Sequence, residues 1–223
     1  MQNSFNIIEA FLQLVKNRFQ LETQGGRSFT LKWTVSRRDA LIIVDVQNDF
    51  CPGGALPVEQ GDRIIPTLNK YIEKFKKAEA TIFATRDWHP PNHISFKQFG
   101  GPWPRHCVRR TKGAEFHPDL KLPEDVIVIS KATDPSRESY SGFDGTKLEQ
   151  ELKKREIKRL FVGGLATDYC VKRTVLDGLT AGFKTILLVD ATKGINNKTN
   201  DSEEAIKEMI RNGARTITIQ EIS

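Results

Sequence analysis

Short apolar runs alternate with amphipathic stretches from Ala40 onward, and this alternation constrains the fold more than any other feature. Strands that alternate with helices form parallel pairs joined by right-handed crossovers. We therefore predict an α/β fold with three α/β/α layers, Rossmann-like, around a six-stranded, mostly parallel sheet. The predicted strands are 40–45, 80–85, 126–131, 160–164, 185–190 and 216–220, and the predicted helices are 63–77, 147–155, 168–181 and 202–211.

Residues 1–36 precede this pattern and are predicted to form a separate N-terminal extension. Apolar residues recur at helical spacing over 4–20, and Gly25-Gly26 then interrupts the pattern. The segment 27–38 is basic and irregular. We expect the extension to dock on the main domain, residues 37–223, or to associate with another chain. An organellar targeting role stays open, because the segment is amphipathic and poor in acids.

The net charge of +6 raises the question of nucleic-acid binding. Residues 1–39 hold six basic and three acidic residues, so half of the excess lies in these first 39 residues. The remaining basic residues are interleaved with acids, which is typical of solvated helix faces. No apolar run approaches the roughly 18 residues of a membrane span. We therefore expect neither nucleic acid nor membrane as a partner.

Cysteine usage indicates the compartment. The chain has three cysteines, an odd number, and no secretory signal opens it. This combination favours a reducing, cytoplasmic environment in which a thiol is free for chemistry.

Reactive side chains follow four predicted strands at the point where each strand ends. Asp45 closes the first, Asp87 and His89 follow the second, Lys131 closes the third and Cys170 follows the fourth. Ligands of open parallel sheets bind beyond the carboxyl ends of the strands. These side chains are therefore expected to meet at one edge as a nucleophile, a proton acceptor and a charge partner.

Cys170 follows a glycine-rich turn between a strand and a helix. Glycine permits close backbone approach there, and Thr167 or Asp168 is expected to cap the helix. A cysteine in the first helical turn is exposed to the positive end of the helix dipole, which favours the thiolate. A buried structural cysteine is the alternative, and we favour the nucleophile.

Three of the four histidines lie within one stretch rich in proline and glycine. His89 and His93 follow Asp87 closely, and a Gly-Gly-Pro-Trp-Pro loop leads to His106. Imidazole and carboxylate are ligands of zinc, iron and manganese. We predict one bound divalent metal ion in this stretch, whereas His117 lies outside it and is expected at the surface.

Motifs across residues 40–220 resemble the nicotinamidase branch of the isochorismatase-like superfamily of cysteine hydrolases. The aspartate-tryptophan-histidine segment and the loop that ends in His-Cys are its more specific signals. The motifs are DVQNDF at 45–50, PGG at 52–54, TRDWHP at 85–90, GPWPRHC at 101–107, SKA at 130–132, YSGF at 140–143 and the turn before Cys170.

The resemblance implies roles for the residues at the strand ends. It implies a catalytic triad of Asp45, Lys131 and Cys170, and an oxyanion hole made by the backbone N–H groups of Ala166 and Cys170. In relatives the peptide at Leu165–Ala166 is cis. The metal ligands implied are Asp87, His89 and His106, with His93 as a further ligand in some members; zinc is the expected ion, with iron or manganese as alternatives.

The resemblance also implies a substrate. Nicotinamide would be deamidated to nicotinate and ammonia through a thioester, in NAD salvage, and pyrazinamide would be a second substrate. Either a homo-oligomer or a monomer is compatible with the sequence. The implied substrate-binding residues are Phe50, Trp103, Tyr140, Leu165 and Tyr169.

Two other classes of function compete with this one. A related cysteine hydrolase acting on another small amide or a vinyl ether would share the triad, but it is not expected to carry Asp87, His89 and His106. A non-catalytic binding protein would use the extension to recruit partners, and the intact triad argues against it.

Overall fold

Six strands form one sheet in the order β3-β2-β1-β4-β5-β6, and all neighbouring pairs are parallel. The computed structural model describes residues 32–223, so the predicted helix over 4–20 lies outside the described residues. The predicted sheet is confirmed, and it is parallel throughout rather than mostly so. The strands are β1 (Asp39–Val44), β2 (Thr81–Asp87), β3 (Ile127–Lys131), β4 (Arg159–Leu165), β5 (Lys184–Lys193) and β6 (Arg215–Ile217).

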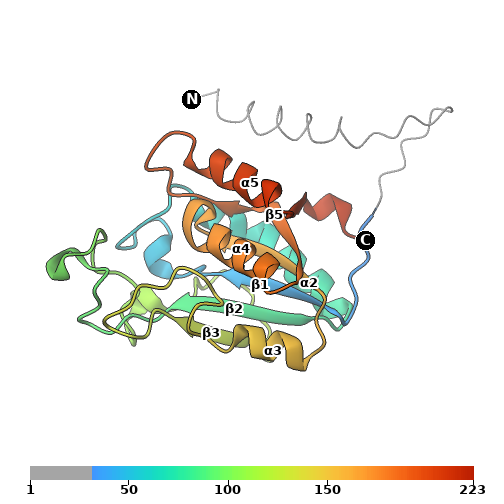
Figure 1. The fold of residues 1–223 in the computed structure, drawn as a ribbon, viewed down its shortest axis with the longest axis horizontal. Helices are drawn as coiled ribbons and strands as arrows, with labels where there is room; N and C mark the ends of the chain where they lie inside the picture. Colours follow the sequence, from blue (N-terminus) through green and yellow to red (C-terminus); the bar gives the residue numbers. More distant parts are fainter. Residues whose placement is uncertain (1–31) are drawn as a thin grey trace. The chain divides into compact units, whose positions relative to one another are not determined.

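Helices cover both faces of this sheet, as predicted (Figure 1). Leu41 and Ile43 of β1 face the cluster that includes α2, because alternate residues of a strand point to opposite faces. Ile42 and Val44 face the cluster that includes α3, α4 and α5. The α-helices of residues 32–223 are α2 (Ile65–Lys77), α3 (Leu148–Lys154), α4 (Lys172–Thr180) and α5 (Asp201–Arg211).

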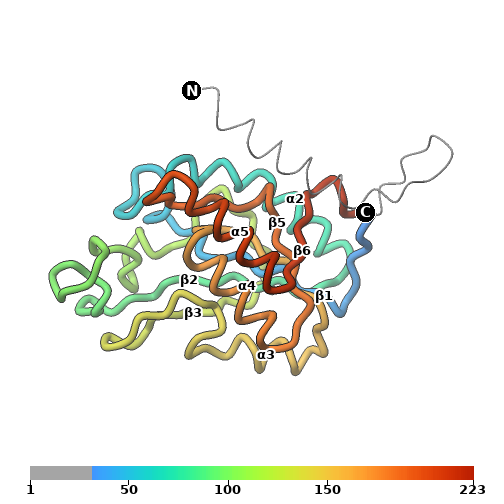
Figure 2. Tube along the Cα trace, turned by 45° about the horizontal axis from the view of Figure 1, so that its top comes forward, coloured from blue at the N-terminus to red at the C-terminus, as the bar shows by residue number. Residues whose placement is uncertain are grey.

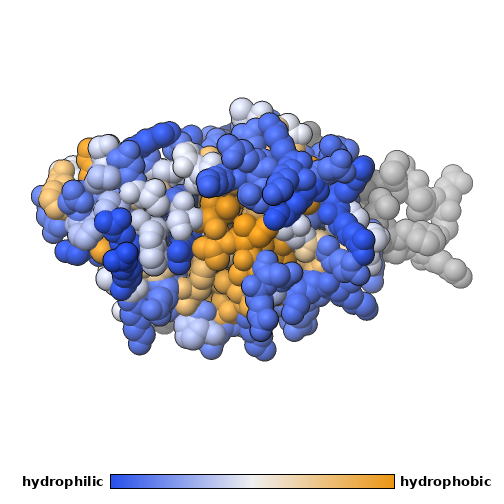
Figure 3. All heavy atoms as spheres, turned by 90° about the horizontal axis from the view of Figure 1, so that it is seen from below, coloured by the Kyte–Doolittle hydropathy of each residue, from blue (hydrophilic) through white to orange (hydrophobic). Residues whose placement is uncertain are grey.

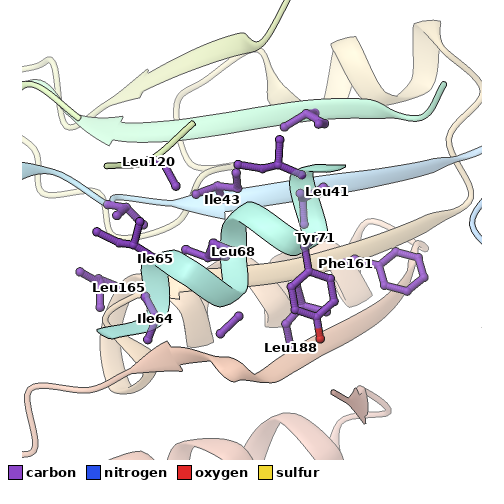
Figure 4. Packing of buried hydrophobic residues seen from close by; sticks show 14 of the residues in the cluster. Leu41, Ile43, Ile64, Ile65, Leu68, Tyr71, Leu120, Phe161, Leu165 and Leu188 are labelled. Carbon is purple, nitrogen blue, oxygen red and sulfur yellow. The ribbon is translucent and has the colours of Figure 1, made fainter. Parts of the chain in front are cut away.

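The packing of α2 shows how the sequence pattern produces this layering (Figure 4). Ile65, Leu68 and Tyr71 recur at helical spacing and are almost fully buried against the sheet. Burial of an aliphatic side chain of this size contributes about 1.5–3 kcal/mol. The Tyr71 hydroxyl donates to Asp190 Oδ1 at 2.8 Å, so Asp190 has a structural role.

The described residues form one compact unit, Lys32–Ser223, and the predicted boundary between residues 36 and 37 stays a prediction. Trp33 forms a parallel bridge to Ile222, and its N–H donates to the carbonyl of Glu221 at 2.6 Å. The guanidinium of Arg159 donates to the carbonyl of Thr34 at 2.8 Å. The beginning of the described chain therefore lies beside its C-terminal end (Figure 2).

The strand order reverses between β1 and β4, which places a ligand crevice beyond the carboxyl ends of these two strands. The two strands come very close there. Gly164 has a φ of +124°, and a Cβ atom at this position would lie 2.1 Å from the carbonyl oxygen of Val44. Glycine is therefore required where β4 leads toward Cys170.

The face shown in Figure 3 is mostly polar, with an apolar area at its centre and a smaller one near one end. β3 is an edge strand, and Val128 at its middle is 40% exposed. None of the helices within residues 32–223 combines the length and the apolar character that a membrane crossing requires.

Candidate active site

The three side chains predicted as a triad meet beyond the strand ends, as the sequence indicated. Lys131 Nζ lies 2.9 Å from Asp45 Oδ2 and 3.5 Å from Cys170 Sγ. An oxygen of Asp45 lies within 4.8 Å of the same sulfur. Asp45 adopts a left-handed backbone conformation (φ 50°), so the chain leaves the sheet immediately after β1 and turns its carboxylate toward the crevice.

Lys131 also contacts Asp87, a contact that the sequence did not reveal. Its ammonium forms an ion pair with each of the two carboxylates and donates to the carbonyl of Ser139 at 3.3 Å. Burial disfavours the charge of Lys131, but Asp45 and Asp87 outweigh burial and raise its pKa well above the usual value. Lys131 is therefore a cation at all ordinary pH values, and it lies between the other two triad residues and the predicted metal ligand Asp87.

Asp45 has the properties of a proton acceptor near neutral pH. It is fully buried, and burial raises its pKa to about 6 against the opposing effect of Lys131. The Thr85 hydroxyl donates to Asp45 Oδ1 at 2.6 Å and fixes the carboxylate. Thr85 lies on β2 within a motif that sequence reasoning associated with the metal, so its role for Asp45 was missed.

The environment of Cys170 corrects two expectations. Thr167–Val171 forms a π-helical turn before α4, and neither Thr167 nor Asp168 caps it. Thr167 bonds to the Thr192 hydroxyl at 2.8 Å, while Asp168 accepts the N–H groups of Ile195 and Asn196. Burial raises the pKa of the Cys170 thiol well above its usual value despite Lys131, so the sulfur rests as a thiol.

Asp87, His89 and His106 form a buried group in which one ligand atom of each lies within 4.8 Å of the others. Nδ1 of His89 donates to the carbonyl of His106 at 3.2 Å, and Nδ1 of His106 donates to the carbonyl of Pro104 at 2.7 Å. These bonds leave the lone pair of each Nε2 available. His89 Nε2 is buried without a hydrogen-bond partner, which is what a metal ligand requires.

Protonation does not compete with metal binding at His89 near neutral pH. Burial lowers the pKa of His89 to about 4, so the ring is neutral. Burial would raise the pKa of Asp87, but Lys131 and the two imidazoles outweigh it and keep the carboxylate ionised. The residues therefore fit a divalent ion with nitrogen and oxygen ligands.

His93 is not a member of this group of three, but it lies beside His89. Its Nε2 donates to the carbonyl of Arg137 at 3.0 Å, and its Nδ1 accepts from the Ser95 hydroxyl at 2.7 Å. Both nitrogens of His93 are hydrogen-bonded, and its ring lies 4.4 Å from that of His89 between centroids. A ligand atom of His93 also lies within 4.8 Å of those of His89 and Glu138, so its role as a further metal ligand stays a prediction. His117 lies outside the group, near Asp119.

A pocket lined by aromatic side chains lies over Cys170. The indole of Trp103 donates to the Tyr140 hydroxyl at 2.9 Å and packs edge-on against Tyr169, with 5.1 Å between ring centroids. Leu56, Glu138 and Ile195 were missed, because they lie in loops without a recognisable pattern. The pocket is lined by Phe50, Leu56, Asp87, Trp103, His106, Glu138, Tyr140, Ala166, Tyr169, Cys170 and Ile195.

Leu165 differs from the other residues expected in the pocket. Its side chain is fully buried in the cluster between the sheet and α2, near Ile64 and Ile65 (Figure 4). Only its peptide group borders the pocket residue Ala166, and the Leu165–Ala166 bond is cis, as expected.

Comparison with known proteins supports the resemblance found in the sequence. The isochorismatase domain matches residues 39–221. The nicotinamidase of Escherichia coli is 39% identical over 201 residues, which cover 81% of this chain and 94% of that protein.

Solved structures agree with this comparison. The pyrazinamidase of Pyrococcus horikoshii in complex with zinc is 56% identical with a TM-score of 0.78, covering 81% of this chain and 99% of that one. The PnC1 protein of L. infantum in complex with nicotinate is 34% identical with a TM-score of 0.80, covering 86% of this chain and 99% of that one.

Proposed function

Because this chain belongs to the isochorismatase family and is a hydrolase of amides, we propose that it deamidates nicotinamide to nicotinate and ammonia. The similar enzyme of E. coli is named a nicotinamidase, and a similar structure holds nicotinate. The observation that carries the proposal is the contact of Lys131 with Cys170, Asp45 and Asp87. Through it the nucleophile lies beside the predicted ligands Asp87, His89 and His106, here called the metal group.

Substrate binding combines the metal group with the aromatic wall. Asp87, His89 and His106 would hold a divalent ion, zinc by analogy with the P. horikoshii structure, which would supply a Lewis acid for the pyridine nitrogen. Phe50 and Trp103 enclose the ring. Fixing the ring places the carboxamide carbon beside Cys170 and converts binding energy into orientation.

The nucleophile is generated by proton transfer within the triad. Asp45 accepts the proton of the Cys170 thiol, and the Lys131 ammonium at 3.5 Å stabilises the thiolate that forms. The sulfur then attacks the carboxamide carbon and forms a C–S bond, while the carbonyl electron pair moves to oxygen. The backbone N–H groups of Ala166 and Cys170 stabilise this oxyanion, and such a donor contributes about 3–4 kcal/mol.

Collapse of this adduct completes the first half of the reaction. The C–N bond breaks, and ammonia leaves with the proton that Asp45 returns, so that a thioester remains. Asp45 then takes a proton from water, which attacks the thioester, and the thiolate that departs is reprotonated. Nicotinate is released, and pyrazinamide, which has the same ring nitrogen and carboxamide, follows the same route. We assign the reaction to the salvage of NAD precursors.

Replacing the nucleophile tests the proposal. Cys170→Ala is expected to lower the rate of ammonia release from nicotinamide by about 10⁴-fold or more, because the covalent route is removed. Cys51→Ala is the matched control, since Cys51 is equally buried but lies outside the pocket lining. Full activity of Cys170→Ala would show that the sulfur is not the nucleophile.

A further inference from the structure

The side chain of Gln47 continues the sheet where β1 stops. The pairing of β1 with β2 ends at Val44 and Thr85, after which Asp45 turns the chain away. Two residues later, the Gln47 carboxamide takes the place of the missing peptide group. Its Oε1 accepts the N–H of Asp87 at 2.8 Å, and its Nε2 donates to the Asp87 carbonyl at 2.8 Å.

The same carboxamide reaches the segment that carries His106. Its second N–H donates to the carbonyl of Ala114 at 2.9 Å, in the 3₁₀ turn Lys112–Ala114 that follows the histidine loop. Gln47 is fully buried, so no water replaces these bonds. The side chain of Gln47 therefore connects the backbone of the predicted ligand Asp87 to the segment that follows the predicted ligand His106.

The neighbouring residues strengthen this connection. The Asn48 amide donates to the carbonyl of Lys112 at 2.7 Å. Asp49 Oδ2 accepts the N–H of Cys107, the residue after His106, at 2.7 Å. A Cβ atom at Gly113 would lie 2.1 Å from the Asp49 carboxylate, so the turn packs directly against it. Residues 47–49 thus hydrogen-bond to the loop around His106 at several points, and of these three residues only Gln47 also bonds to the backbone of Asp87.

We infer that Gln47 is a positioning residue that sets the spacing of Asp87 and His106 and thereby the affinity of the protein for its divalent ion. This inference rests on the metal group of the proposed function. An apolar residue at position 47 would leave the N–H and carbonyl of Asp87 unpaired in a buried place, and the backbone of Asp87 would move to recover partners. Loss of a group that orients metal ligands typically lowers metal affinity by about 10- to 100-fold.

The experiment measures zinc affinity directly, by competition between a chromophoric chelator and the metal-stripped full-length protein. Gln47→Met is expected to bind zinc about 10- to 100-fold more weakly than the unchanged protein. Gln47→Glu keeps the volume and the acceptor for the Asp87 N–H but turns a carboxylate oxygen toward the carbonyls of Asp87 and Ala114, so it is also expected to weaken zinc binding.

A matched control separates positioning from general loosening. Asn69 also pairs its amide with loop backbone, at Asp119 and Lys121, but lies on α2 away from the metal group. Asn69→Leu is expected to lower the thermal midpoint of the metal-free protein and leave zinc affinity unchanged.

Each result decides between the alternatives. Wild-type affinity in both Gln47 variants, or an equal loss in Asn69→Leu, would overturn the inference while the proposed function stands. If the unchanged protein binds no zinc, both the inference and the metal part of the proposed function fail, whereas the outcome for Cys170→Ala is unaffected.

Discussion

Lys131 is predicted to stabilise the folded protein as well as the thiolate of Cys170. The variant Lys131→Met tests the effect on folding. Methionine keeps most of the side-chain volume but removes the cation that contacts Asp45 and Asp87. The Nζ–Oδ2 separation of 2.9 Å at Asp45 corresponds to an attraction of about 6 kcal/mol at an effective dielectric constant of roughly 20. Desolvation of the charges cancels much of this attraction.

Lys131→Met destabilises the folded protein because it leaves the buried carboxylates of Asp45 and Asp87 without a counter-ion. Removing one partner of a buried ion pair typically lowers the free energy of unfolding by about 3–5 kcal/mol. We expect a loss of this size at pH 8 in the metal-free protein, measured by urea denaturation. Lys172→Met is the matched control, because its ion pair with Glu208 at 3.2 Å is partly exposed, and a loss below about 1 kcal/mol is expected.

The pH dependence gives the sharper test. Without the cation, burial and mutual repulsion raise the folded-state pKa of the carboxyl pair above the unfolded value of about 4. The folded variant then binds more protons than the unfolded chain, so its stability increases as the pH falls through that window. The deficit of Lys131→Met should therefore shrink at pH 5. An equal deficit at pH 5 and pH 8, or none at either, would refute this account of the charge balance.

Two further predictions concern catalysis. In the proposed mechanism Asp45 is the base, and its pKa of about 6 predicts that kcat/KM for nicotinamide falls with decreasing pH to about a tenth of its plateau near pH 5. Thr85→Val removes a hydrogen bond to the carboxylate and should move this fall to higher pH. A rate independent of pH between 5 and 8 would contradict the prediction. Removal of the metal should raise KM for nicotinamide, and His89→Ala should raise it equally. Added zinc should return KM to its original value in the unchanged protein but not in the variant. Unaltered kinetics after chelation would disprove the ligand assignment.

The alternation of elements was readable because burial imposes it on local sequence. A strand buried on both faces needs a run such as residues 40–44, and a helix on a sheet needs apolar residues at the spacing found over 64–75. The ends of elements were less predictable. Cys170 lies in a π-helical turn, Thr167 bonds to Thr192 of β5 and Asp168 to the loop at Ile195, because partners far apart in the chain compete with local capping.

The sequence by itself therefore determined the layers of the fold, the strand ends that carry Asp45, Lys131 and Cys170, and the crowding of histidines near Asp87. Only the tertiary structure decided that Lys131 joins both carboxylates, that Gln47 holds Asp87, that both nitrogens of His93 are hydrogen-bonded, and that Leu165 packs into the core. The physical reason is that periodicity records which face of an element is buried, whereas hydrogen bonds and charge pairs between loops depend on atoms brought together from segments tens of residues apart.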